Sequence, residues 1–236
     1  MSHLRPFACA LAVCLVPWAL AAENSASAIE KLRQGNQEFA AGRIDTSKLA
    51  APVASSMKPI ASVLSCSDQS LPAEIIFGQG SGDLFVVRVS GAVANQEVLA
   101  SLEYSVEQLG SRLVVVMGHT SCGVVKAALD SMRPGSKQPG VNIQSLLNFI
   151  RPALQRPRER ADPWTSAVYA SVEQTMTDII QHSLVIGELA RAGDITLIGA
   201  VYQPETGKVA FSKPVQFSKL KTDLPLSLAS GEKQTP

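Results

Sequence analysis

Arg112-Leu113-Val114-Val115-Val116-Met117-Gly118-His119-Thr120-Ser121-Cys122-Gly123 places an almost wholly apolar run directly before a histidine and a cysteine. A run this rich in valine is typical of a strand that is covered on both faces of a parallel sheet. The apolar pattern of residues 124–132 then predicts a helix. The stretch therefore predicts a strand, a turn that carries His119 and Cys122, and a helix, as in an α/β fold.

A second apolar run, residues 59–65, ends at Cys66-Ser67-Asp68-Gln69-Ser70. The carboxyl ends of adjacent parallel strands lie at one edge of the sheet, where open α/β sheets build their sites. We therefore expect Cys66 and Asp68 to meet His119 and Cys122. Two thiols, an imidazole and a carboxylate are the donors that zinc favours, so the sequence predicts a metal site at this edge.

The remaining segments alternate between strand and helix patterns. Strands are expected at residues 59–65, 84–89, 112–117, 195–202 and 208–212, and helices at 25–42, 72–77, 95–110, 124–132, 146–154 and 166–191, the last with a break near Ser183. This order predicts an α/β fold class with a mostly parallel central sheet flanked by helices. It also predicts an N-terminal helix and an antiparallel edge strand near the C-terminus.

The first residues have the composition of a targeting segment. Residues 1–5 are short and basic, residues 6–20 are almost wholly apolar, and small residues follow up to Ala22. This pattern predicts a Sec-type signal peptide over residues 1–22, with an uncleaved interfacial helix as the alternative. The protein is then expected to be secreted or periplasmic, without a membrane anchor after cleavage. Residues 23–236 are expected to form a single domain with a loose tail from about residue 223.

Charge gives little indication of a large charged partner. The 236 residues carry a formal net charge of +1, and acidic and basic residues are interspersed. Nothing in this pattern indicates binding to nucleic acid or to an anionic membrane surface.

The cysteine count leaves two interpretations open. Of four cysteines, Cys9 and Cys14 lie in the predicted signal peptide, which leaves Cys66 and Cys122. In an oxidising compartment a lone pair of cysteines is by default a disulfide. From the residues alone, a disulfide and a zinc site are both possible.

From residue 29 to residue 212 the chain resembles the β-class carbonic anhydrases. The matching motifs occur in order: Gly35-Asn36-Gln37-Glu38-Phe39, Cys66-x-Asp68, Pro72-x-Glu74, Gly82-Asp83-Leu84-Phe85-Val86-Val87-Arg88, Ala100-Ser101-Leu102-Glu103-Tyr104, Gly118-His119-Thr120-Ser121-Cys122-Gly123, Gly199-Ala200-Val201-Tyr202 and Thr206-Gly207. The resemblance implies a zinc-dependent lyase that reversibly hydrates CO₂ to bicarbonate and a proton. It favours zinc over the disulfide.

The resemblance also implies particular roles for residues. Zinc would be bound by Cys66, His119 and Cys122, with water or hydroxide at the fourth position, and the protein would be a homodimer or a dimer of dimers. Zinc lowers the pKa of a bound water towards about 7, which supplies hydroxide at neutral pH. Asp68 would be the catalytic carboxylate.

Other positions match residues of the family's pocket. By position, Phe85, Tyr104 and Gly123 would line the substrate pocket, and Arg88 resembles an arginine that binds non-catalytic bicarbonate in some members. Each also has a structural interpretation: Phe85 as a core residue, Tyr104 as an inward-packing helix residue and Arg88 as an ion-pair partner.

Two positions depart from the family pattern. The usual motif is Cys-x-Asp-x-Arg, and this chain has Ser70 at the arginine position. In the family that arginine holds the aspartate off the metal, and a serine cannot reproduce its two-pronged hydrogen bonding. We therefore expect Asp68 to bind zinc as a fourth ligand for a larger fraction of the time. Ala92, where relatives often have asparagine, is the second departure.

The loss of the arginine keeps two alternatives to an ordinary carbonic anhydrase. The first is a weakly active or inactive member with a closed zinc site, acting as a binding or scaffold dimer. The second is a hydrolase of CS₂ or COS, because related sites support that chemistry.

Overall fold

The computed structural model describes residues 18–50, 52, 57–70, 72–155 and 162–215. Residues 1–17 of the predicted signal peptide and the tail predicted from residue 223 lie outside these ranges. None of the helices in the described ranges is long and apolar enough to cross a membrane.

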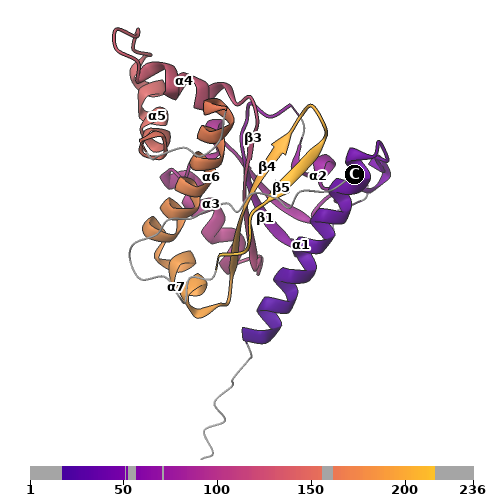
Figure 1. The fold of residues 1–236 in the computed structure, drawn as a ribbon. Helices are drawn as coiled ribbons and strands as arrows, with labels where there is room; N and C mark the ends of the chain where they lie inside the picture. The colour runs from indigo at the N-terminus through magenta and orange to yellow at the C-terminus, as the bar shows by residue number, and fades with distance from the viewer. Residues whose placement is uncertain (1–17, 51, 53–56, 71, 156–161, 216–236) are drawn as a thin grey trace, which may run out of the picture.

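One sheet organises the described residues, with strand order β2-β1-β3-β4-β5 (Figure 1). Its strands are β1 (Ala61–Ser65), β2 (Leu84–Arg88), β3 (Leu113–His119), β4 (Thr196–Gln203) and β5 (Lys208–Phe211). β1 pairs in parallel with β2 and β3, β3 pairs in parallel with β4, and β5 is an antiparallel edge strand on β4. The predicted fold class and its antiparallel edge are confirmed.

Helices cover both faces of the sheet, so the fold has three layers (Figure 1). They are α1 (Trp18–Ala40), α2 (Ala73–Ile76), α3 (Gln96–Glu107), α4 (Gly123–Ser131), α5 (Val141–Leu154), α6 (Pro163–His182) and α7 (Leu184–Ala192), with short 3₁₀ turns η1 (Thr46–Leu49) and η2 (Ser90–Ala92). Helices α1 and α2 cover one face, and α3 to α7 cover the other. Val114 and Val116 face the larger layer, while Val115 and Met117 face α1 and α2. This explains why β3 is apolar at every position before its last residue, His119.

Three helices begin earlier than the sequence predicted: α1, α5 and α6, the last at Pro163 rather than at residue 166. Helix α1 begins at Trp18 rather than at residue 25, and Ser25 inside it donates a hydrogen bond to the Arg112 carbonyl at 2.9 Å. Helix α5 begins at Val141 rather than residue 146, because its first turn is exposed and so carries no apolar periodicity. The break predicted near Ser183 is confirmed: its hydroxyl accepts from the Ile186 amide and caps α7.

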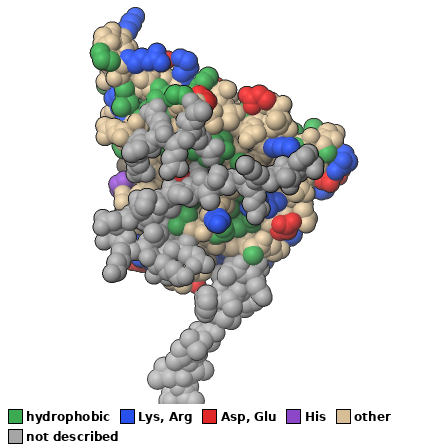
Figure 2. Space-filling model, viewed as in Figure 1, with side chains coloured by type: hydrophobic (Ala, Val, Ile, Leu, Met, Phe, Trp, Pro, Cys, Tyr) green, Lys and Arg blue, Asp and Glu red, His purple; other side chains and the backbone are tan. Residues whose placement is uncertain are grey.

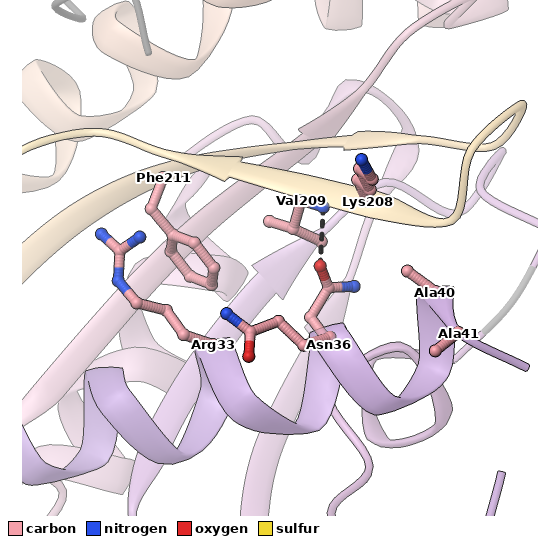
Figure 3. A pocket seen from close by; sticks show the side chains of 8 residues that line it. Arg33, Asn36, Ala40, Ala41, Lys208, Val209 and Phe211 are labelled. Atoms are coloured by element: carbon pink, nitrogen blue, oxygen red, sulfur yellow. Dashed lines mark hydrogen bonds between the residues drawn. The ribbon is translucent and has the colours of Figure 1, made fainter. Parts of the chain in front are cut away.

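Gly35 and Asn36 fasten α1 to the rest of the fold. A Cβ atom at Gly35 would lie 1.6 Å from the Phe77 carbonyl oxygen, so only glycine permits this approach. The buried Asn36 side chain donates to the carbonyls of Ile76 and Gly207 and accepts from the Val209 amide at 2.8 Å (Figure 3). It thereby joins α1 to both α2 and the edge strand β5.

A surface pocket of about 490 Å³ lies between α1 and β5 (Figure 3). The Arg33 guanidinium lies 4.8 Å from the centroid of the Phe211 ring on its border. The pocket does not include the residues predicted to bind metal.

Charged side chains of both signs are spread over the surface. Figure 2 shows Lys and Arg side chains at the tip beyond α4, and a mixture of basic and acidic side chains over the other described parts of this face. Within the described ranges, ion pairs join Arg43 to Glu38 and both Lys126 and Arg133 to Asp130. All are solvent-exposed, so they contribute little to stability.

We predict that Gly35→Ala destabilises the fold by about 3 kcal/mol, because the added methyl group would collide with the Phe77 carbonyl. Chemical denaturation of both proteins measures the change. Gly140→Ala is the matched control, since a Cβ atom there meets nothing within 4 Å, and it should cost less than about 1 kcal/mol. Equal stability of the Gly35→Ala variant and the unmodified protein would contradict the prediction.

Candidate metal centre

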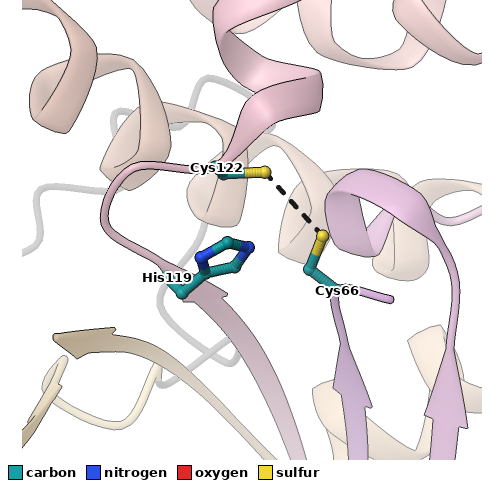
Figure 4. Close-up of side chains that lie close together, drawn as sticks. All are labelled: Cys66, His119 and Cys122. Carbon is teal, nitrogen blue, oxygen red and sulfur yellow. Dashed lines mark hydrogen bonds between the residues drawn. The ribbon is translucent and has the colours of Figure 1, made fainter. Parts of the chain in front are cut away.

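Cys66, His119 and Cys122 converge at the carboxyl edge of the sheet (Figure 4). Cys66 follows β1, His119 is the last residue of β3, and Cys122 is the N-cap of α4. Their donor atoms all lie within 4.8 Å of one another, and the three residues are 1%, 4% and 2% exposed. The predicted convergence is confirmed for these three residues.

The two cysteines are free thiols in this structure, with their sulfur atoms 3.8 Å apart. That separation is a hydrogen-bond distance rather than a covalent one. Of the two interpretations that the cysteine count left open, this arrangement agrees with the zinc site and not with the disulfide.

The histidine is oriented by a hydrogen bond to its neighbour. His119 Nδ1 donates to the Thr120 carbonyl at 2.9 Å, which leaves Nε2 with its lone pair. Nε2 is buried, and the described residues offer it no hydrogen-bond partner. A buried nitrogen acceptor beside two sulfurs fits a zinc ion, which takes nitrogen and sulfur ligands.

The thiol pair shares its protons unequally in the metal-free protein. The hydrogen bond from the Cys122 thiol is the largest influence on Cys66 and lowers the pKa of Cys66 to about 4, against the opposing effect of burial. The same hydrogen bond, together with burial, raises the pKa of Cys122 well above its usual value. For His119, burial works to lower the pKa, but the adjacent Cys66 thiolate outweighs it and the pKa is raised.

Backbone amides also stabilise the Cys66 thiolate. The amides of Gly91 and Asp68 donate to Cys66 Sγ at 3.1 and 3.4 Å. Gly91 lies in η2 with φ +79°, followed by Ala92 with φ +50°. This left-handed conformation costs alanine about 1 kcal/mol, whereas asparagine tolerates it better. The departure at Ala92 is therefore a local strain beside the site rather than the loss of a ligand.

Asp68 lies outside the group of three potential ligands. Its Oδ2 accepts a hydrogen bond from the Gly123 amide at 2.7 Å. Gly123 is the first residue of α4, so its amide has no partner within the helix and points from the positive end of the helix dipole. A Cβ atom at Gly123 would lie 3.0 Å from Oδ2, so glycine allows the carboxylate to approach.

Phe85 and Tyr104 are not brought to the metal centre within one chain. Phe85 pairs with Ser62, four residues before Cys66, which is about 13 Å along the strand. The two aromatic rings contact each other with centroids 6.3 Å apart, and Tyr104 is 53% exposed. The interpretation of Tyr104 as an inward-packing helix residue is therefore wrong.

Arg88 binds the turn that follows Cys66. Its Nη2 donates to the Gln69 carbonyl at 2.7 Å. Among the ion pairs of the described ranges none includes Arg88 or Asp68. The ion-pair interpretation of Arg88 is therefore replaced by a contact with the backbone of the turn.

Two contacts of the centre could not be found from the sequence. The contact of Gly91 gave no sequence signal, because the residue type does not indicate the direction of a backbone amide. Trp164, in the second position of α6, donates from Nε1 to the Cys122 carbonyl at 2.9 Å. The helix predicted from residue 166 did not include Trp164, so no sequence pattern indicated this contact.

Comparison with known proteins gives one consistent result. The sequence model of the family described as carbonic anhydrase matches residues 61–209. Carbonic anhydrase 2 of Mycobacterium tuberculosis (strain H37Rv) is 35% identical over 193 residues, which are 78% of this chain and 91% of that protein. A carbon disulfide hydrolase of Acidithiobacillus thiooxidans is 25% identical over 152 residues, 61% of this chain and 73% of that protein.

The fold has the same relatives. The Coccomyxa β-carbonic anhydrase, solved in complex with acetazolamide, superimposes with a TM-score of 0.60 at 24% identity. The match covers 86% of this chain and 89% of that one.

We predict that zinc affinity rises with pH between 6 and 8. Because its pKa is raised, Cys122 keeps its proton in the metal-free protein, and zinc must displace that proton. Each displaced proton makes the affinity rise about tenfold per pH unit. Competition with a chelator of known protonation behaviour measures the slope. Cys122→Ser should lower the affinity, and a zinc affinity of the unmodified protein that stays constant over this range would contradict the prediction.

Proposed function

This chain belongs to the carbonic anhydrase family, and on that premise we propose how its own residues carry out the reversible hydration of CO₂ to bicarbonate and a proton. The β class agrees with the fold and with the metal-binding residues. The observation that carries the proposal is the buried Cys66–His119–Cys122 group at the sheet edge.

Cys66 Sγ, His119 Nε2 and Cys122 Sγ would hold the zinc ion. When bound, zinc lowers the pKa of a coordinated water and so supplies hydroxide for attack on CO₂ at neutral pH. The Gly91 and Asp68 amides stabilise the negative charge on Cys66, and the Thr120 carbonyl keeps the His119 ring in the required tautomer. These contacts keep the ligands in position before the metal arrives.

Asp68 is the carboxylate that accepts a hydrogen bond from the reacting water. Its Oδ2 is engaged by the Gly123 amide, which leaves Oδ1 to accept a hydrogen bond from the reacting water. An acceptor in this position orients a lone pair of the water oxygen towards CO₂. The proton is then passed to solvent, which completes the conversion to bicarbonate.

The two alternatives are supported less well. A closed site would need Asp68 among the metal-binding group, and its carboxylate is instead held by Gly123. The carbon disulfide hydrolase is a more distant relative, at 25% identity against 35% for the carbonic anhydrase. CO₂ hydration is therefore the function that the site and the relatives favour.

A homodimer, alone or as half of a dimer of dimers, accounts for the position of Phe85 and Tyr104. β2 is an edge strand of the sheet, and beside it the half-exposed Tyr104 ring contacts Phe85. Exposed aromatic rings beside an unpaired strand edge are typical of an interface between subunits. In such a dimer these rings can line a pocket that the single chain leaves incomplete.

We propose that the protein is exported from the cytoplasm. The basic residues 1–5 and the apolar residues 6–20 support a cleaved signal peptide and a secreted or periplasmic location.

We predict that Asp68→Asn lowers kcat/KM for CO₂ hydration about a hundredfold, because an amide accepts the proton poorly while keeping the shape of the carboxylate. Stopped-flow assays with a pH indicator measure this on the zinc-loaded protein. Ser70→Ala is the control and should stay within about threefold of the unmodified protein. Failure of the zinc-loaded unmodified protein to hydrate CO₂ would overturn the proposed function.

We predict that Tyr104→Asp shifts the sedimentation mass from two chains or more towards one, because a carboxylate would be buried in the proposed interface. Leu184→Asp is the matched control: Leu184 is 75% exposed on α7, and its replacement should leave the mass unchanged. A monomeric unmodified protein would contradict the dimer, as would a Tyr104→Asp variant of unchanged mass.

A further inference from the structure

A single peptide group lies between Trp164 and Asp68. The Cys122 carbonyl accepts from Trp164 Nε1 at 2.9 Å and from the Lys126 amide of α4 at 3.1 Å, and the Gly123 amide donates to Asp68 Oδ2 at 2.7 Å. That carbonyl and that amide belong to one trans peptide unit, which is planar and rigid. Its C=O and N–H bonds point in opposite directions, so the hydrogen bonds on its two sides together fix the orientation of the whole plane.

Trp164 is itself firmly placed. It lies in the first turn of α6, where Asp162 caps the amides of Trp164 and Thr165 at 3.1 and 2.9 Å. Its ring packs against the larger core cluster, which includes residues of α4 and α6. A partly buried indole N–H requires an acceptor, and the Cys122 carbonyl provides it.

Asp68 needs such a partner in this chain. Ser70 stands where the family's arginine would hold the carboxylate, and none of the ion pairs in the described ranges includes Asp68. The amide of Gly123 is the donor that remains for Oδ2. The direction of that amide depends on the peptide plane, whose carbonyl is held by the Lys126 amide within α4 and by the Trp164 indole from α6.

We propose that Trp164 is a positioning residue for Asp68, acting through the Cys122–Gly123 peptide and serving in place of the arginine absent at position 70. The indole N–H orients the carbonyl, and the attached amide holds the carboxylate away from the metal. Hydrogen bonds in a chain polarise one another, so the indole also strengthens the amide as a donor. The proposal rests on the proposed function for the role of Asp68.

The test compares Trp164→Phe with Phe149→Leu. The first removes the N–H and keeps an aromatic ring in place, and the second trims a ring that packs against the same core cluster but carries no hydrogen-bond donor. Each variant is loaded with cobalt(II), whose visible absorption bands report the ligands around the metal. CO₂ hydration of the zinc form is measured in parallel.

We expect Trp164→Phe to alter the cobalt bands and to lower kcat/KM about tenfold, a typical effect of losing an outer partner of a metal site. Phe149→Leu should change neither. Adding Ser70→Arg to Trp164→Phe should restore the bands and bring kcat/KM within about threefold of the unmodified protein, because arginine holds Asp68 directly.

A Trp164→Phe protein with unaltered cobalt bands would overturn the proposal, as would a loss that Ser70→Arg does not restore. These results are distinct from failure of the proposed function, in which the unmodified zinc protein shows no CO₂ hydration while the cobalt bands still respond.

If Trp164→Phe does not fold, the unmodified chain supplies the measurement. The indole N–H signals of the two tryptophans are separated in NMR spectra by Trp18→Phe in the full chain. A Trp164 signal that exchanges with water far more slowly than a free indole supports the hydrogen bond. Exchange at the free rate overturns the proposal.

Discussion

Parallel pairing of β1 with β3 is the constraint on which the site depends. Ser65 is aligned with Met117, so the residues that follow the two strands emerge at the same edge. Cys66 and His119 are close only because this register holds, and a shift by one residue would turn a ligand to the opposite face. The fully buried β1 and β3 are packed between two helical layers, so a shifted register would have to be accommodated by the close-packed side chains on both faces.

Around the ligands, backbone amides rather than side chains donate many of the hydrogen bonds that stabilise negative charge. Amides from Gly91, Asp68 and Gly123 reach Cys66 or the Asp68 carboxylate. Directing these amides inward requires unusual backbone conformations, and Ala92 and Ser121 both have positive φ beside the centre. Strain of this kind persists where the surrounding structure determines it, which here is the packed sheet edge.

The fold and the three ligands could be predicted because each has a local signal. Apolar periodicity marks the strands and most helices, and the position of Cys66 and His119 at strand ends marks the ligands. The contact between Trp164 and Cys122 has no such signal, because it joins residues 42 apart through a backbone carbonyl. Because the arginine is absent at position 70, the sequence predicted that Asp68 binds the metal. In the structure the carboxylate accepts a hydrogen bond from the Gly123 amide. Every residue except proline has a backbone amide, so the sequence could not indicate this partner. Phe85 and Tyr104 lie at the β2 edge of the sheet, away from the ligands, and the sequence alone did not indicate this position.

The separation of the ligands along the chain has a consequence for folding. Cys66 and Cys122 are 56 residues apart, so a metal bound to both closes a long loop of the polypeptide. In chain-entropy models a permanent cross-link over such a loop stabilises a protein by about 4 kcal/mol, through the disorder that it removes from the unfolded ensemble. The metal is thus a reversible staple as well as a reagent, and resistance to heat should follow its concentration in the surroundings.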